Sequence, residues 1–208
     1  MKLVMEEMIK KYSKLVRDRI PEIIEDAGNT CVTEILSNED YLRMLEICTG
    51  ITGRQDLLEE NGISVQEQIS RVLQQAEKRG TAPTVLCLRA SASLITVKNS
   101  EDNVLGAMLK SLGCVNIADS ETSLLENLSI ERILQLDPDY IFIAQRGDDR
   151  EGMIQNVEAM MQENPAWLQL TAVKEGKVYY MDKNLYNLKP NHRWGEAYEK
   201  LEAILADG

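Results

Sequence analysis

The sequence predicts an α/β fold: a mostly parallel sheet with helices on both faces, preceded by a helical N-terminal segment and a long helix. Two observations carry this prediction. Residues 140–144, YIFIA, form a short and almost entirely apolar run, which is typical of a parallel strand buried on both faces. From residue 84 onward, short β-rich runs alternate with segments of helical period, as successive βα units do. A hydrophobic content of 44% in 208 residues is ample for a core.

The first part of the chain is predicted to be helical. Residues 1–47 are rich in charge, and the sequence SNED at residues 37–40 is a helix start signal. Apolar residues recur at helical spacing in the second half of residues 57–78, and Gly62 is expected to interrupt or bend that helix. We therefore expect three regions, at residues 1–47, 48–82 and 83–208: a helical segment, a long helix and an α/β lobe.

The elements of the lobe follow in order. Ser129 is a good helix N-cap, and Pro138 ends the helix that Ser129 begins, because a proline disfavours helical dihedrals in the residue before it. Gly113 is the expected C-cap of an earlier helix. Strands are expected at residues 84–89, 93–98, 115–118, 140–144 and 178–181. Helices are expected at residues 100–112, 122–127, 129–136, 151–162 and 190–206, with a short one from residue 164.

Composition excludes several functional classes. A net charge of −11 argues against a nucleic-acid or anionic-membrane surface, which needs basic patches. The four cysteines are widely spaced and His192 is the only histidine, so no zinc or redox site is predicted. Cys87 and Cys114 lie in apolar runs and are expected to be buried thiols. The N-terminus has no apolar signal region, so the sequence as it stands predicts a cytoplasmic protein.

One resemblance covers residues 47–208. The sequence SIERILQLDPDYI at residues 129–141 resembles the second lobe of the substrate-binding proteins of bacterial ABC importers for iron-siderophores, haem and cobalamin. Residues 112–118, 167–182 and 188–201 are similar to the same family in the same order. The resemblance implies a single Rossmann-like lobe of a class III periplasmic-binding-protein fold, with the first lobe missing. It also implies a metal chelate as ligand, an ABC permease as partner and an extracytoplasmic location.

A second resemblance lies at residues 11–46. KYSKLVRDRIPEIIEDAG, residues 11–28, and VTEILSNEDYL, residues 32–42, are similar to the start of MazG-like nucleotide pyrophosphohydrolases. Those enzymes hold magnesium with carboxylates spaced E-x-x-E and E-x-x-D, which places each pair on one helix face. Glu22 and Glu25 have the first spacing but lie within the opening motif, and the second is absent. We therefore expect a stub without catalytic residues.

Polar residues are expected around one edge of the lobe. In open α/β sheets, ligands bind beyond the carboxyl ends of the strands. A mixed rim of arginine, lysine and tyrosine suits an anionic chelate through charge-assisted hydrogen bonds. The alternative for each residue is a solvated loop position, and Trp167 and Trp194 are expected to pack between helix and sheet. The candidate ligand-binding residues are Arg146, Asp148, Tyr186, Lys189, Arg193, Asn103 and Ser100.

Glu131 matches the glutamate with which this importer family contacts an arginine of its permease. At the second position of a helix, a glutamate is also favoured by the helix dipole, so both roles stay open.

The leading hypothesis is a non-enzymatic, truncated binding lobe without a cofactor, whose ligand is a ferric siderophore, haem or a cobalamin. Because a lone lobe exposes the surface that its partner lobe normally covers, a homodimer is favoured. Two alternatives stay open. One is a nucleotide pyrophosphohydrolase completed by another chain, and the other is a degenerate fusion product that folds but binds nothing.

Overall fold

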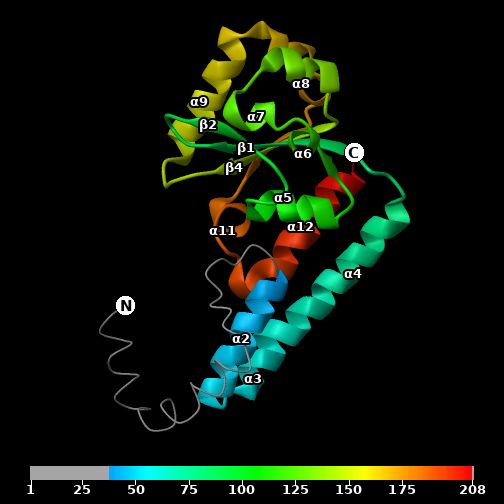
Figure 1. The fold of residues 1–208 in the computed structure, drawn as a ribbon, viewed down its shortest axis with the longest axis vertical. Helices are drawn as coiled ribbons and strands as arrows, with labels where there is room; N and C mark the ends of the chain where they lie inside the picture. The colour runs from blue at the N-terminus through cyan, green and yellow to red at the C-terminus, as the bar shows by residue number, and fades with distance from the viewer. Residues whose placement is uncertain (1–37, 208) are drawn as a thin grey trace. The chain divides into compact units, whose positions relative to one another are not determined.

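The computed structural model describes residues 38–207 (Figure 1). The chain divides into two compact units, residues 1–64 and 65–208. Each unit is described by itself. The MazG-like motif at residues 11–28, with Glu22 and Glu25, lies outside the described residues, as does Cys31.

The described part of the first unit is helical. It contains α2 (Asn38–Thr52), α3 (Gln55–Leu58) and the π-helical turn η1 (Glu59–Ile63). The start signal at residues 37–40 is confirmed by the first residue of α2, and α2 ends before Gly53, whose φ is +71°. Residues 48–82, expected to form one long helix, are therefore divided by this turn and by the π-helical segment.

Gly62 lies in the π-helical turn, where the sequence predicts a break or a bend. A Cβ at this position would lie 2.9 Å from Leu42 and 3.1 Å from both Leu45 and Leu58. A glycine therefore lets the turn approach these leucine side chains closely without displacing them. The Tyr41 hydroxyl donates a hydrogen bond to the carbonyl of Asn61, 3.0 Å away, and fixes the same contact.

The second unit begins with most of α4 (Ser64–Arg79). Its buried residues, Val65, Ile69, Val72 and Ala76, are spaced three or four apart and form one apolar stripe. The helix ends at Gly80, whose φ of +69° is typical of a residue that follows a helix C-cap.

A five-stranded sheet forms the centre of the second unit (Figure 1). Its strands are β1 (Thr84–Ala90), β2 (Ile95–Lys98), β3 (Val115–Asn116), β4 (Tyr140–Gln145) and β5 (Val178–Met181). The order is β2-β1-β4-β5, and β3 pairs with the start of β1. The pairs of β1 with β4, β4 with β5 and β1 with β3 are parallel, whereas β2 is antiparallel to β1. The mostly parallel sheet is thus confirmed.

Helices cover both faces of the sheet, and every residue of β4 is buried (Figure 1). On one face, Leu86, Leu88, Ile141 and Ile143 belong to a core that includes residues of α8 and α9. On the other face, the rings of Tyr140, Phe142 and Tyr179 stack. Helices α5 and α12 lie on that side. The helices are α5 (Val104–Ser111), α6 (Ile117–Ser120), α7 (Ser123–Glu126), α8 (Ile130–Leu136), α9 (Arg150–Glu163), η2 (Pro165–Gln169), α10 (Thr171–Lys174), α11 (Lys183–Tyr186), η3 (Asn191–Arg193) and α12 (Trp194–Ala206).

Local capping explains where the elements differ from the sequence prediction. The helix expected from residue 100 begins at Val104, because the Asn103 side chain caps it by accepting from the Gly106 N–H at 2.8 Å. The strand expected at residues 115–118 ends at Asn116, whose side chain accepts from the Ala118 N–H and starts α6. Ser129 caps α8 as predicted, and Asp137 ends it in the left-handed conformation, with φ +39°.

The expectations for cysteine and tryptophan are confirmed where the chain is described. Cys87 and Cys114 are buried and free, and burial raises the pKa of the Cys114 thiol to about 12. Trp167 and Trp194 are buried to the same degree as the core aliphatic residues. In the described part of the chain, no helix combines the length and the apolar character needed to span a membrane.

Candidate functional site

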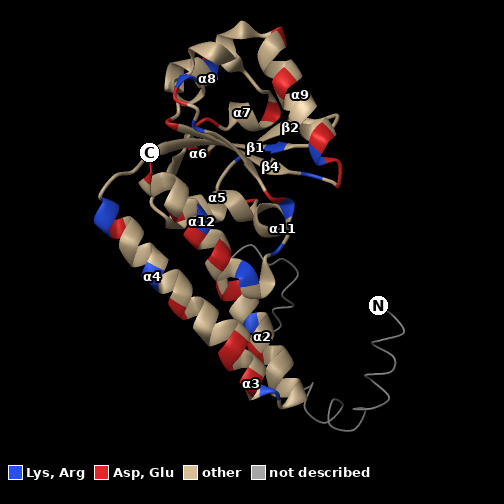
Figure 2. Ribbon diagram, turned by 180° about the vertical axis from the view of Figure 1, so that it is seen from behind, with Lys and Arg blue, Asp and Glu red and all other residues tan. Residues whose placement is uncertain are grey.

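The carboxyl ends of three parallel strands meet at one edge of the sheet, here called the carboxyl edge. The register pairs Ala90 with Gln145 and Ala144 with Met181, so β1, β4 and β5 end side by side. The segments that follow them, at residues 91–94, 146–149 and 182–193, form this edge. Figure 2 shows acidic and basic residues next to one another between β4 and α9.

The loop after β4 is held by its backbone. The Arg146 N–H donates to the Ala90 carbonyl at 2.7 Å, which extends the pairing of β1 and β4 by one residue. The buried Gln145 side chain donates to the Gly147 carbonyl at 3.0 Å, and Gly147 takes a φ of +80°. Asp149 caps α9 by accepting from the Gly152 N–H at 2.8 Å.

The Arg146 side chain, in contrast, is exposed. It makes no hydrogen bond or ion pair with any other residue that the structure describes. The loop therefore presents an uncommitted guanidinium, meaning one that bonds to no described residue, at the position predicted from the sequence.

Helix α9 ties the loop after β4 to the loop after β1. A Cβ on Gly152 would meet Ala92 at 2.9 Å, so the first turn of α9 lies directly against the β1–β2 connection. The Asn156 side chain donates to the Ser91 carbonyl at 2.9 Å. These contacts fix the relative position of two of the three loops at the carboxyl edge.

An ion pair links the loop after β4 to the segment after β5. The Lys183 ammonium donates to the Asp148 carboxylate, and this hydrogen bond lowers the pKa of Asp148. Asp148 is almost fully exposed. Lys183 was not among the predicted site residues, although it follows the last strand by two residues, and the same topological rule would have included it.

Tyr186 lies at this edge but is turned inward. It is 3% exposed, and its hydroxyl donates to the Ala197 carbonyl of α12 at 3.0 Å. Burial raises the pKa of this phenol above its ordinary value, so it stays neutral. The sequence analysis did not predict this burial, because Tyr186 belongs to the short helix α11, where a loop was expected.

Arg193 and Lys189 differ in whether they bond to another described residue. The Arg193 guanidinium donates to both carboxylate oxygens of Glu196, at 2.6 and 2.9 Å, and Lys200 donates to the same carboxylate at 2.8 Å. These bonds, Arg193 first, lower the pKa of Glu196 to about 2. Lys189 is exposed and makes no hydrogen bond or ion pair with a described residue.

Ser100 and Asn103 are not brought to the carboxyl edge. Because β2 is antiparallel to β1, with Lys98 opposite Cys87, the chain leaves β2 toward the other end of β1. The Ser100 N–H donates to Asp119 at 2.7 Å, and the Asn103 amide donates to the Asn99 carbonyl. The Ser100 N–H and the Asn103 side chain thus hold the segment before α5, while the Ser100 hydroxyl is buried without a partner among the described residues.

Glu131 is the second residue of α8 and is exposed. Its carboxylate accepts from the Ser129 hydroxyl at 3.1 Å, within the cap of its own helix. The described residues contain no cluster of three or more histidine, cysteine or acidic side chains arranged to hold a metal ion.

Comparison with known protein families identifies the family of this chain. Residues 11–185 match the family described as periplasmic binding protein. The chain belongs to the periplasmic binding protein family. The match begins at residue 11 and so includes the segment that resembles the pyrophosphohydrolases. Among curated proteins, none matches the chain.

Solved structures of periplasmic binding proteins share the fold. One is IsdE of Staphylococcus aureus in complex with heme, with a TM-score of 0.67 and 18% identity over 81% of this chain and 64% of that chain. A second is the periplasmic heme-binding protein RhuT of Roseiflexus sp. RS-1, with a TM-score of 0.66 and 16% identity over 82% and 64%. A third, from an ABC-type Fe3+-hydroxamate transport system of Saccharomonospora viridis, has a TM-score of 0.63 and 16% identity over 81% and 56%.

These matches confirm the importer resemblance and the predicted fold. The family consists of extracytoplasmic substrate-binding proteins of transporters, which differs from the cytoplasmic location expected from the N-terminal sequence. The chain spans 64% of the length of IsdE and of RhuT.

Proposed function

We propose that this chain is a ligand-binding lobe of an ABC-transporter solute-binding protein, that it acts outside the cytoplasm and that it is not an enzyme. Its ligand is an anionic metal chelate of the iron-siderophore, haem or cobalamin type. The family match over residues 11–185 supports the solute-binding role. The ligands named for IsdE, RhuT and the hydroxamate system support the chelate class.

The observation that carries the binding site is the state of Arg146. Its backbone is fixed by the hydrogen bond to Ala90, while its guanidinium is exposed and uncommitted. A charged donor held on a rigid loop loses little freedom on binding an anion, and charge-assisted bonds are the stronger class. Lys189 supplies a second uncommitted cation from the segment after β5.

Two further cations are paired with carboxylates of the chain, with which an anionic ligand would compete. Lys183 is paired with Asp148, and Arg193 is paired with Glu196. The proposal therefore keeps Arg146, Lys189, Asp148 and Arg193 at the binding edge and adds Lys183. It leaves out Ser100 and Asn103, which lie away from the carboxyl edge, and Tyr186, whose hydroxyl bonds within the lobe.

Glu131 is proposed as a contact with the permease. It is exposed, and its one hydrogen bond among the described residues is to the neighbouring Ser129. Glu131→Ala should lower chelate uptake by cells without changing chelate binding by the purified protein. A loss of binding in this variant would contradict the assignment.

The test is a thermal-unfolding screen of the purified chain against ferric siderophores, haem and cobalamin. A ligand at about 100 times its dissociation constant adds about 2.7 kcal/mol of stability. Arg146→Ala should weaken chelate binding about tenfold or more, the size expected for a hydrogen bond to a charged group. Arg71→Ala is the matched control, because Arg71 is an equally exposed arginine of α4 without a described partner.

Absence of chelate binding, or equal losses in the Arg146 and Arg71 variants, would contradict the proposed function. Magnesium nucleotides form a separate arm of the screen, and release of pyrophosphate there would support the enzymatic alternative. Sedimentation with and without the chelate tests the expected homodimer, in which a second copy would cover the carboxyl edge.

A further inference from the structure

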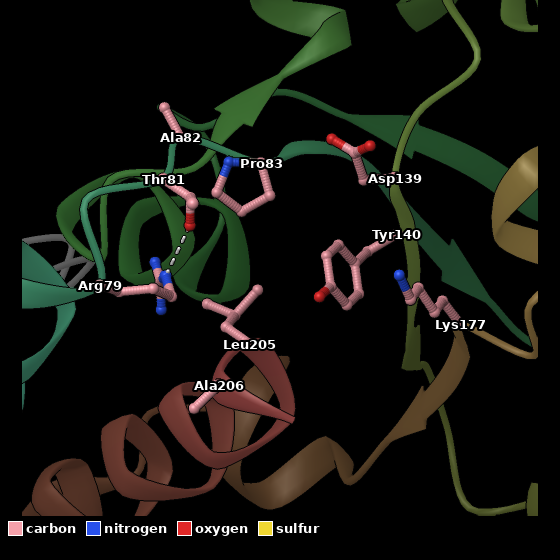
Figure 3. Close-up of a pocket in the computed structure, with 9 residues that line it drawn as sticks. All are labelled: Arg79, Thr81, Ala82, Pro83, Asp139, Tyr140, Lys177, Leu205 and Ala206. Carbon is pink, nitrogen blue, oxygen red and sulfur yellow. Dashed lines mark hydrogen bonds between the residues drawn. The ribbon is translucent and has the colours of Figure 1, made fainter. Parts of the chain in front are cut away.

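A pocket lies at the opposite, amino edge of the sheet, where β1, β4 and β5 begin (Figure 3). Its volume is about 430 Å³, within the range of small-molecule sites. Its walls are the segment that leads from α4 into β1, the end of α12, and the first residue of β4. We call it the Tyr140 pocket, and the residues used below are Arg79, Pro83, Tyr140, Lys177 and Leu205.

Tyr140 carries the strongest indication of a ligand. It is only 4% exposed, yet its hydroxyl has no hydrogen-bond partner among the described residues. Figure 3 shows the hydroxyl directed toward the side of the pocket formed by Arg79 and Leu205. The hydroxyl is thus open to the pocket and is free to bond with a molecule there.

The Tyr140 ring is held firmly, so its hydroxyl is a fixed donor. The ring stacks on Phe142, with centroids 5.9 Å apart, and lies beside Tyr179 at 6.4 Å. The Lys177 ammonium lies 5.3 Å from its centroid. Burial raises the pKa of the phenol, which keeps the proton on the oxygen at neutral pH.

Arg79 supplies the second donor group. Its guanidinium donates to Thr81 at 3.2 Å, to the Leu112 carbonyl at 2.8 Å and to the Glu202 carboxylate. A guanidinium has five N–H groups, so two remain without a partner among the described residues. The three bonds that are made fix the plane of the guanidinium.

The other charged groups have partners that keep them out of this role. Asp139 accepts from the Thr84 N–H at 2.7 Å and the Thr84 hydroxyl at 2.8 Å. Lys177 is 2.7 Å from Glu175. The neighbouring hollow between α4 and α12 is lined by Glu199 and Glu202, which makes it unsuited to an anion.

We propose that the Tyr140 pocket binds a small monocarboxylate with an apolar body, independently of the chelate site. The carboxylate would accept from the Tyr140 hydroxyl and from the free N–H groups of Arg79, and its apolar part would contact Pro83 and Leu205. This site lies at the other end of the strands from Arg146, so a chelate at the carboxyl edge does not compete for it.

The test uses benzoate as the probe and benzamide as its neutral match, titrated into the full chain and followed by two-dimensional amide NMR. Benzoate should shift the amides of Thr84 and Lys177 but not that of Arg146, and benzamide should bind at least about tenfold more weakly. Tyr140→Phe should weaken benzoate binding about tenfold or more, since it removes a hydrogen bond to a charged group. Arg79 is left intact, because its removal would leave Glu202 buried without a partner.

Tyr179→Phe is the matched control: it removes a hydroxyl from the same aromatic stack but from a residue outside the pocket lining, and benzoate affinity should not change. Three results would overturn the proposal: no amide shifts at about 10 mM benzoate, equal affinity for benzamide, or unchanged affinity in Tyr140→Phe. None of these depends on chelate binding, so the two proposals fail separately.

Discussion

At the two edges of the sheet, an arginine and a tyrosine occur in opposite states. At the carboxyl edge, Arg146 is exposed and uncommitted, while Tyr186 is buried with its hydroxyl bonded to Ala197. At the amino edge, Arg79 is largely buried and paired with Glu202, while the Tyr140 hydroxyl opens into the pocket without a partner among the described residues. The guanidinium is available to a ligand at the carboxyl edge, and the phenol is available to a ligand at the amino edge.

The difference shows that topology brings polar residues to an edge of the sheet, whereas packing decides whether their side chains are open to a ligand. At the carboxyl edge, a backbone hydrogen bond to Ala90 holds the loop after β4, and the Arg146 side chain stays exposed. The amino edge is closed by the end of α12 and by the segment after α4, which turns side chains inward around a pocket. An open rim suits a large chelate, and a pocket of about 430 Å³ suits a small molecule.

The largest expected effect is at the buried ion pair of the amino edge. Glu202→Ala should lower the free energy of unfolding by about 3–5 kcal/mol, because it leaves Arg79 buried without its counter-charge. Urea denaturation measures this. Glu199→Ala, an exposed position on the same helix, should change stability by less than about 0.5 kcal/mol. Similar effects of the two variants would show that the pair of Arg79 and Glu202 does not contribute the stability expected of a buried ion pair.

The two tyrosines give the next test. Tyr186→Phe should cost about 1 kcal/mol, the net value of a buried hydrogen bond, because it orphans the Ala197 carbonyl. Tyr140→Phe, without ligand, should leave stability almost unchanged, because the hydroxyl that it removes bonds to no described residue. Both values come from the same denaturation experiment. A comparable loss in both variants would mean that Tyr140 has a partner, and the contrast between the edges would disappear.

A smaller effect depends on pH at the carboxyl edge. Because the folded pKa of Glu196, about 2, lies below its ordinary value of 4.5, ionised Glu196 stabilises the fold above about pH 4.5. This contribution is lost as the pH falls from 4.5 toward 2. It should not exceed about 1 kcal/mol, since the pair is partly exposed and screened by solvent. Comparing the pH dependence of unfolding in wild type and Glu196→Gln measures it, and parallel profiles would contradict it.

The smallest effect on stability is expected at Asp148, because it is almost fully exposed. Asp148→Asn should leave unfolding unchanged but release Lys183, so that an anionic chelate binds about twofold to fivefold more tightly at low salt. The gain should fall with added salt. Weaker binding in this variant would instead identify Asp148 as a direct contact with the ligand.

The sequence by itself determined the elements whose signals are local. The apolar run at residues 140–144 predicted β4, Ser129 predicted the start of α8, and Gly62 predicted an interruption. Each depends on a period, a cap or a glycine within a few residues of the feature that it specifies. The order of motifs from residue 112 to 201 also indicated the family, which the match over residues 11–185 confirms. The position of Arg146 directly after β4 was also predictable, because the end of a buried apolar run is a local signal.

Only the tertiary structure decided which polar residues meet. The antiparallel direction of β2 moved Ser100 and Asn103 away from the carboxyl edge. The pairing of Arg79 with Glu202 joins residues 123 positions apart. Packing of α11 against α12 buried Tyr186, whose residue type alone is as common on a surface as in a core. Strand direction and long-range contacts depend on how distant segments pack, and no local stretch of sequence contains that information.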